Sequence, residues 1–186
     1  MNQEGRLIVV EGIDGAGKTT LCDKLVNEYN LNYMTQPENS WVGDVARKAL
    51  REDVEPGCDL FLHMAAHANQ QPRIRDNLQN SDVIMDRYFH SRVAYQSVQS
   101  QFSEDFIYEL HTGWSVEPTF TILLDIPADE ALRRKAGNRD KFEGQKFLTE
   151  VRSTYLDFFG NHSDVIIVDG TKSKDELYNE VSGILF

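Results

Sequence analysis

The sequence predicts an α/β fold in which a five-stranded parallel sheet lies between two layers of helices. Short apolar runs alternate with amphipathic helical segments along the whole chain, which is typical of βαβ units. The first run, RLIVV at residues 6–10, leads directly into a glycine-rich loop and then a helical segment. Parallel strands joined by helices are covered on both faces, so these observations together predict a three-layer αβα sandwich.

Five strands are expected where apolar, β-branched residues gather. They lie at residues 6–10, 32–36, 82–87, 119–127 and 164–170. The fourth run, TFTILLDIP, is the clearest of them, and Pro127 marks its end because proline has no N–H for a sheet ladder. Each run is followed by a helical segment, as repeated βαβ units require.

Eight helices are expected between and after these strands. They lie at residues 18–29, 43–52, 59–80, 89–98, 104–114, 128–137, 147–159 and 173–186. Pro72 should bend or split the third helix, because proline removes a backbone donor and clashes with the preceding turn. Ser173, with Glu176 three residues later, predicts a capping box at the start of the last helix.

Length and charge limit the possible functions. The 186 residues suit a single domain spanning 1–186. No apolar run approaches the roughly 20 residues that cross a bilayer, and the first residues lack the pattern of a signal peptide, so we expect a cytoplasmic protein. The formal net charge of -11 argues against polymeric nucleic acid as a partner. Cys22 and Cys58 are too few for a disulfide framework.

The glycine-rich loop fits the phosphate-binding pattern G-x-x-x-x-G-K-[ST] and has a strand before it and a helix after it. It indicates a fold of the P-loop NTPase type. Its glycines let backbone N–H groups face an anion, Lys18 would reach the β- and γ-phosphates of ATP, and Thr19 would ligate Mg²⁺. The predicted ATP-binding residues are Gly12, Ile13, Asp14, Gly15, Ala16, Gly17, Lys18, Thr19 and Thr20.

Two further features predict a second phosphate site and a lid. Asp86 and Arg87 end the third predicted strand, and ligands of such sheets bind at the carboxyl ends of the strands. Asp86 is therefore a candidate for holding Mg²⁺ or its water, and Arg87 for binding another phosphate. The basic residues Arg133, Arg134, Lys135, Arg139 and Lys141 predict a short lid at about 133–143 that closes over the transferring phosphoryl group.

Four segments in sequence order resemble the thymidylate kinase family of nucleoside monophosphate kinases. They are EGIDGAGKTT at 11–20, DRYFHSRVAYQ at 86–96, PTFTILLDIPADEALRR at 118–134 and RDKFEGQKFLTEVRSTYLDF at 139–158. The resemblance implies transfer of the γ-phosphoryl group of ATP to a deoxynucleoside monophosphate, with dTMP the usual acceptor. It also implies a homodimer.

The resemblance assigns roles to individual residues. Asp14 takes the position that contacts the 3′-hydroxyl of the acceptor, Arg87 the position that binds its phosphate, and Tyr95 the position under the deoxyribose. Because the loop carries Gly15 where some members have arginine, the catalytic basic residues are expected in the lid. The catalytic set is Lys18, Arg87, Arg134 and Arg139, and the remaining substrate-binding candidates are Glu38, His63, His67, Ser91, Arg92 and Gln96.

The predicted base pocket departs from the family pattern. The family usually has F-x-x-[AN]-R on the helix after the second strand, where this chain has His63 and His67. Arg92 stands where a small or amide residue is usual, and Asn39 where an arginine is common. Two interpretations follow. Either the pocket still takes dTMP, or base choice is altered or broadened toward a 5-substituted deoxyuridylate or a guanine-like base.

Other classes make different predictions. A regulatory GTPase needs an N-K-x-D motif after a late strand, and the sequence has none. A deoxynucleoside kinase usually shows E-R-S where this chain has DRY at 86–88. A non-catalytic binding module would have an inert lid. Away from the site, His111 and His162 are expected at the surface, and Trp41 and Trp114 are interpreted as packing residues.

Overall fold

The computed structural model describes residues 5–134 and 144–186. Its centre is a sheet of five parallel strands in the order β2-β3-β1-β4-β5. The strands are β1 (Leu7–Glu11), β2 (Asn32–Thr35), β3 (Val83–Asp86), β4 (Phe120–Asp125) and β5 (Val165–Asp169). The central strand β1 pairs Val10 with Asp86 on one side and with Ile122 on the other, so the loop after β1 leaves the sheet between two strand ends.

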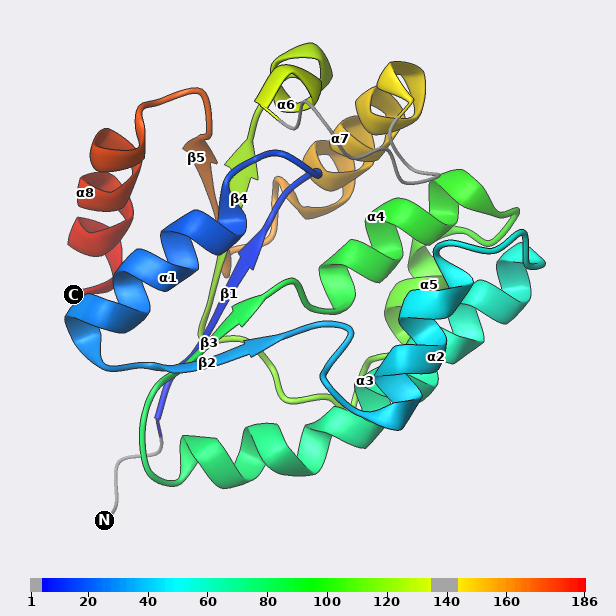
Figure 1. The fold of residues 1–186 in the computed structure, drawn as a ribbon, viewed down its shortest axis with the longest axis horizontal. Coiled ribbons are helices and arrows are strands. Elements are labelled where there is room, and N and C mark those ends of the chain that lie inside the picture. The colour runs from blue at the N-terminus through cyan, green and yellow to red at the C-terminus, as the bar shows by residue number, and fades with distance from the viewer. Residues whose placement is uncertain (1–4, 135–143) are drawn as a thin grey trace.

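Helices cover both faces of the sheet (Figure 1). They are α1 (Lys18–Tyr29), α2 (Trp41–Ala49), α3 (Pro56–Leu78), α4 (Phe89–Gln99), α5 (Glu104–Glu109), α6 (Ala128–Arg134), α7 (Gln145–Phe159) and α8 (Lys174–Leu185). Figure 1 shows α1 and α8 on one side of the sheet and α4 and α7 on the other. The predicted three-layer αβα sandwich with a five-stranded parallel sheet is confirmed.

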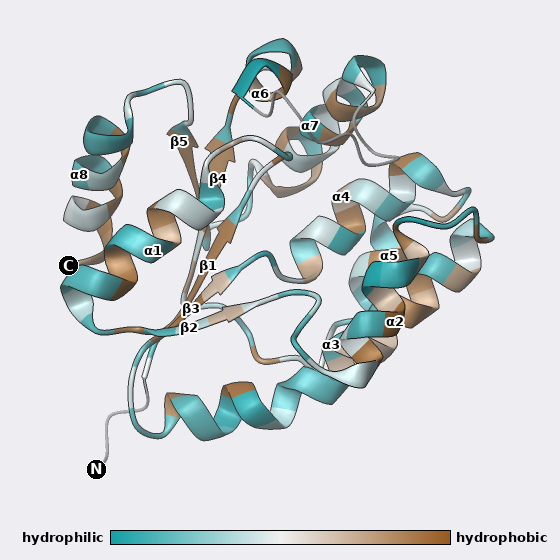
Figure 2. Ribbon diagram, in the orientation of Figure 1, coloured by the Kyte–Doolittle hydropathy of each residue, from teal (hydrophilic) through white to brown (hydrophobic). Residues whose placement is uncertain are grey.

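The core lies between the sheet and these helices. Every residue of β1 is buried, and so is every residue of β3, because strands of a parallel sheet are covered on both faces. Figure 2 shows the hydrophobic strands in the middle of the molecule and hydrophilic helix surfaces around them. Among the described residues, no helix is long and apolar enough to cross a membrane.

The structure departs most clearly from the predictions for α3 and α5. Pro72 does not split α3, which continues through it to Leu78; the side chain of Ile74, just beyond the proline, is buried and anchors the last part of the helix in the core. The fifth helix ends at Glu109 instead of 114, because the chain turns there and Gly113 adopts a left-handed φ of 82°. The capping box of Ser173 and Glu176 is confirmed.

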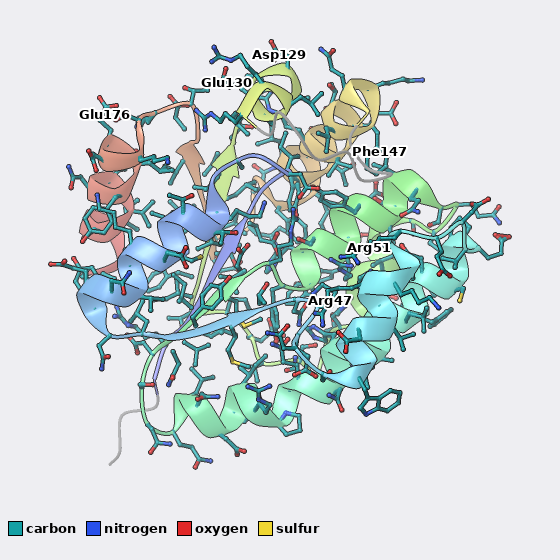
Figure 3. All side chains as sticks on the ribbon, viewed as in Figure 1. Arg47, Arg51, Asp129, Glu130, Phe147 and Glu176 are labelled. Carbon is teal, nitrogen blue, oxygen red and sulfur yellow. The ribbon has the colours of Figure 1, made fainter. Side chains whose placement is uncertain are left out.

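Two predictions about single side chains are also wrong. His111 was expected at the surface but is buried, because its Nδ1 lies 2.8 Å from the Ile107 carbonyl and its ring packs on Phe89. Trp41 was expected to pack, but 78% of its surface is exposed at the first position of α2. Figure 3 draws the side chains as sticks on the ribbon.

Candidate nucleotide-binding site

A cavity of about 900 Å³ opens at the carboxyl ends of the strands. Its walls are the loop after β1, the first turns of α1, the ends of β2 and β3, and the connection from β5 to α8. The predicted site residues in this lining are Asp14, Gly15, Ala16, Gly17, Lys18, Thr19, Thr20, Asp86, Arg87 and Arg134. The structure thus brings the loop, the strand-end pair and one basic residue of the lid around a single space.

Glycine is required in the loop by backbone conformation and by space. Gly12 has a φ of 137°, and a Cβ there would lie 2.6 Å from the carbonyl oxygen of Leu124. Gly15 has a φ of 88°, and a Cβ there would lie 2.3 Å from the carbonyl oxygen of Ala131 in α6. Side chains at these positions would meet β4 and α6. The loop can therefore lie close to its neighbours while its main chain lines the cavity.

Lys18 holds the loop from within. Its Nζ donates hydrogen bonds to the carbonyl oxygens of Gly12 and Ile13, both at 2.9 Å. Burial, helped by repulsion from Arg87, lowers the pKa of Lys18 to about 8. A buried cation next to a main-chain cradle at the start of a helix is a favourable position for a phosphate group.

Thr19 and Asp86 meet at the wall of the cavity. The Thr19 hydroxyl donates to Asp86 Oδ2 at 2.5 Å, and the Tyr33 hydroxyl donates to the same oxygen at 3.4 Å. A hydroxyl and a carboxylate are the hard oxygen ligands that Mg²⁺ prefers, and Mg²⁺ needs only one or two protein ligands beside its waters. The donor set therefore fits the predicted metal.

Arg87 is fixed by several contacts at the end of β3. Its backbone has a left-handed φ of 70°, which turns its side chain toward the loop. One Nη donates to the Gly12 carbonyl at 3.3 Å and to Ser91 Oγ at 3.0 Å, and the other pairs with Asp14. The guanidinium carbon lies 5.2 Å from the centre of the Tyr95 ring. Although burial opposes the charge, Tyr95 and Asp14 raise the pKa of Arg87 above its usual value.

Glu11 lies behind the site and supports it, and it is not among the residues predicted from the sequence. Its buried carboxylate ends β1 and accepts hydrogen bonds from the Tyr88 N–H at 2.6 Å, from Ser91 Oγ at 2.6 Å and from the Tyr155 hydroxyl at 2.8 Å. It ties β1 to the start of α4 and to α7. A signal was present, because a carboxylate at the end of an otherwise apolar strand is buried only if it is hydrogen-bonded.

Glu38 lies beside α2 and α3, and the lining of the cavity does not include it. Its carboxylate accepts hydrogen bonds from Ser40 Oγ at 3.1 Å, from Asn69 and from Arg73 at 3.4 Å. Its backbone carbonyl accepts from Arg47, a residue of α2 labelled in Figure 3. Glu38 thus fixes the connection between β2 and α2.

His67 is enclosed by the protein. Only 1% of its surface is exposed. Gln36 Nε2 lies 2.8 Å from its Nδ1, and Ser115 Oγ and Gln71 Nε2 lie 2.8 and 3.1 Å from its Nε2. Burial, with added repulsion from the neighbouring His111, lowers the pKa of His67 to about 2. Both ring nitrogens therefore have protein partners, which leaves neither for a base edge.

The other base-pocket candidates form a buried polar cluster between α3 and α4. His63 of α3 lies one turn after Asp59, with its Nε2 3.7 Å from Asp59 Oδ1. Gln96 of α4 donates to Asp59 Oδ2 at 3.1 Å. Arg92 lies one turn before Gln96 and is also buried. His63, Arg92 and Gln96 were each predicted from the sequence, and the fold brings them together. Asp59 lies in the same cluster but was not predicted.

Arg134 ends α6 and reaches across the cavity wall. Its guanidinium donates to Glu130 at 2.9 Å and to the carbonyl oxygens of Gly170 and Thr171 at 2.8 and 3.2 Å. Figure 3 labels Glu130 on α6 and Glu176 on α8 at the same end of the molecule. Arg139 and most of the predicted lid lie outside the described residues.

Comparisons with known proteins agree on one family. The thymidylate kinase family matches residues 10–181. A probable thymidylate kinase of Halorubrum lacusprofundi is 35% identical over 96% of each chain, and one of Methanococcoides burtonii is 32% identical over 96% of this chain and 94% of its own. The solved thymidylate kinase of Candida albicans has the same fold, with a TM-score of 0.89 at 23% identity over 98% of this chain and 91% of its own. The chain therefore belongs to the thymidylate kinase family and is a nucleoside monophosphate kinase.

Proposed function

We propose that this chain transfers the γ-phosphoryl group of ATP to dTMP, giving ADP and the diphosphate needed for dTTP synthesis. One observation carries the proposal: two cations from different elements converge on one carbonyl oxygen. Lys18 Nζ and an Arg87 Nη lie 2.9 and 3.3 Å from the oxygen of Gly12. Each faces the same cavity, so one can hold the phosphates of the donor while the other holds the phosphate of the acceptor.

Phosphoryl transfer asks mainly for positioning and for neutralisation of charge. The loop amides and Lys18 hold the donor, and Arg87 binds the acceptor phosphate with its planar fork. Asp14 is paired with Arg87 and lies in the wall of the same cavity. Its carboxylate would accept a hydrogen bond from the sugar hydroxyl of the acceptor, whose sugar would lie near Tyr95.

Magnesium is part of the proposal. Thr19 and Asp86, already in contact at 2.5 Å, would hold the ion through one hydroxyl and one carboxylate or its water. When bound, Mg²⁺ supplies neutralisation of the charge on the donor phosphates. An ion held by these two residues, one from α1 and one from β3, would lie on the Lys18 side of the cavity.

The lid supplies the remaining positive charge. Arg134 lies in the cavity wall and donates hydrogen bonds to main-chain carbonyls beyond β5. It would therefore lie on the side of the cavity that binds ATP. Arg139, five residues further along, is the other proposed catalytic residue. An arginine that reaches the transferring group in such enzymes is worth about 10³-fold or more in rate.

The rest of the assignment concerns the molecule as a whole. We place the activity in a single kinase domain spanning 1–186, in the cytoplasm, and in a homodimer. The dimer is supported by exposed apolar side chains on two helices that pack together, namely Trp41 and Val45 of α2 and Phe61 of α3, because exposed apolar surface commonly marks an interface.

The test is release of ADP with ATP and Mg²⁺, measured separately with dTMP and with thymidine. Turnover with dTMP and none with thymidine is expected, since Arg87 needs a phosphate to bind. Arg87→Lys should raise KM for dTMP by about 10-fold or more while leaving KM for ATP nearly unchanged, because lysine lacks the fork. Arg75→Lys, on the exposed side of α3, is the matched control. Turnover of thymidine in place of dTMP would reassign the enzyme as a nucleoside kinase.

A further inference from the structure

Helix α7 is hydrogen-bonded to the ends of two paired strands. Arg152 donates to both carboxylate oxygens of Asp125, the last residue of β4, at 2.6 and 2.9 Å. One turn later, the Tyr155 hydroxyl donates at 2.8 Å to Glu11, the last residue of β1. Tyr155 is 2% exposed, Glu11 is not exposed at all, and neither lies in the lining of the cavity. The second contact can therefore affect a ligand only through other residues.

The Glu11 carboxylate is surrounded by hydrogen-bond donors. One oxygen accepts from the main-chain N–H groups of Tyr88 at 2.6 Å and of Ser91 at 3.2 Å. The other oxygen accepts from the Ser91 hydroxyl at 2.6 Å and from the Tyr155 hydroxyl at 2.8 Å. These hydrogen bonds offset the cost of burying the group. They also hold the carboxylate in one orientation between β1, α4 and α7.

Ser91 passes this orientation on to Arg87. An ionised carboxylate only accepts hydrogen bonds, so the single hydroxyl hydrogen of Ser91 must point at Glu11. The lone pairs of the same hydroxyl are then left for an Arg87 Nη, which donates to it at 3.0 Å. Ser91 is itself fully buried and does not lie in the lining of the cavity. The chain of hydrogen bonds therefore has a fixed direction and ends on the residue proposed to bind the acceptor phosphate.

Glu11 also holds the backbone beside Arg87. The φ of Arg87 is 70°, a left-handed conformation that a residue with a side chain keeps only when its surroundings enforce it. The N–H of Arg87 donates to the Val10 carbonyl at 3.0 Å, and the next N–H, of Tyr88, donates to Glu11 at 2.6 Å. Two consecutive residues of β1 thus enforce the conformation that turns Arg87 toward the loop.

We infer that three residues behind the site, Glu11, Ser91 and Tyr155, are positioning residues. They hold the Arg87 guanidinium in the orientation that binds the acceptor phosphate, and none of them contacts the substrate. The inference rests on the proposed function, because it takes Arg87 as the residue that binds this phosphate. The donor side has different support, since Lys18 is held by carbonyl oxygens of the loop. Loss of a hydroxyl from the chain should therefore weaken binding of the acceptor phosphate and spare ATP.

The experiment measures kcat, KM for dTMP and KM for ATP in Ser91→Ala and Tyr155→Phe, each of which removes one hydroxyl and no charge. Ser91→Ala should raise KM for dTMP by about 10-fold, because Arg87 loses a direct acceptor. Tyr155→Phe should raise it by less, because its hydroxyl acts one step further away. KM for ATP should be nearly unchanged in both. Calorimetric titration should show weaker binding of dTMP but unaltered binding of thymidine, which offers Arg87 no phosphate.

Glu11→Gln tests the direction of the chain. The main-chain N–H groups of Tyr88 and Ser91 need an acceptor, so the amide oxygen would replace the carboxylate oxygen that they share, and the NH₂ group would face the two hydroxyls. The Ser91 lone pairs would then be claimed by this NH₂ group instead of Arg87. The loss of dTMP binding should be at least as large as in Ser91→Ala, again with thymidine spared. Unchanged binding of dTMP in Glu11→Gln would contradict the inference.

Tyr29→Phe is the matched control, because it removes a hydroxyl that contacts Ser182 between α1 and α8, and it should change none of these constants. Equal losses of dTMP and thymidine binding in Ser91→Ala, or an equal rise in KM for ATP, would mean a structural role alone and would overturn the inference. When added to Arg87→Met, Ser91→Ala should cause no further loss of dTMP binding, since no guanidinium is left to orient. A full additional loss would overturn the inference as well.

If Ser91→Ala fails to fold, Tyr155→Phe decides by the same criteria. A wild-type enzyme that does not phosphorylate dTMP would defeat the proposed function. An active wild type whose folded variants keep the KM for dTMP would defeat this inference alone.

Discussion

The charged side chain of Lys18 is buried before any nucleotide binds. Its Nζ is satisfied by two carbonyl oxygens of the loop, and burial lowers its pKa from the usual value of a lysine to about 8. The charged form is therefore dominant at neutral pH but not far above it. Phosphate binding depends on that charge, so the residue links affinity for ATP to pH.

We predict that the Kd for ATP rises as pH increases through about 8. Below this value Lys18 is charged and attracts the phosphates, and above it the free enzyme loses the proton, so affinity falls by at most about 10-fold per pH unit. Calorimetric titration with ATP between pH 6.5 and 9.5 measures the effect. Lys18→Arg, whose group stays charged, should bind with little dependence on pH. A wild-type Kd that is constant up to pH 9.5 would contradict the prediction.

At this scale, spacing along the chain predicted part of the site. Lys18 and Thr19 follow from the loop pattern, and Asp86 and Arg87 from their place at the end of a strand. The place of Glu11 at the end of an apolar strand signals a buried carboxylate, but its partners, such as Tyr155, lie far along the chain and were not predictable. Asp59 carried no such signal. The enclosure of His67 was hidden for the same reason, since Ser115 lies 48 residues away.

Among the elements, α6 and the loop after β1 are fitted to each other. Gly15 leaves room for the carbonyl oxygen of Ala131, which would lie 2.3 Å from a Cβ at that position. The same helix carries Arg134 at its end. The position of a proposed catalytic arginine thus depends on the absence of a side chain in the loop.

Gly15→Ala should destabilise the protein by more than its backbone conformation alone explains. A positive φ costs a non-glycine residue about 1–3 kcal/mol, and displacement of α6 adds to this. Gly113→Ala is the matched control, because Gly113 also has a positive φ, of 82°, but a Cβ there would meet nothing within 4 Å. Urea unfolding of both variants gives the two free energies. Equal losses would show that α6 does not resist the extra atom.

The existence of elements was easier to predict than their ends. Alternating apolar runs predicted every strand of the sheet, because burial on both faces requires them. The continuity of α3 through Pro72 was not predicted, since it depends on tertiary anchoring by Ile74 that outweighs a local preference. The early end of α5 depends on the turn at Gly113.

Several histidines of the folded molecule are buried in their neutral form. Burial lowers the pKa of His67 to about 2, of His90 to about 3 and of His111 to about 4. These rings lie among aromatic side chains, with Phe89 packed on both His90 and His111. In the unfolded chain each would titrate near 6.5. Between these lowered values and about pH 6.5, the unfolded chain therefore binds protons at these histidines that the folded protein does not bind.

The free energy of unfolding should consequently fall as pH decreases below about 6.5. Stability contributed by neutral histidines is fully present above that pH, and each one can contribute a slope of up to about 1.4 kcal/mol per pH unit below it. Urea unfolding between pH 7.5 and 5.0 covers the window above the titration of most carboxylates. His111→Asn should reduce the slope. Constant stability down to pH 5.0 would contradict the prediction.

Lys18 and Arg87 share one hydrogen-bond acceptor, the Gly12 carbonyl oxygen. The enzyme should therefore discriminate between ligands by the distance between their two phosphate ends. Both side chains are hydrogen-bonded to the same oxygen, so the distance between their cationic groups cannot increase unless one of these hydrogen bonds breaks. A compound that tethers two nucleosides by a chain of phosphates can satisfy both cations only when its chain matches that gap. Inhibitors of this enzyme are therefore constrained by their linker before they are constrained by their bases.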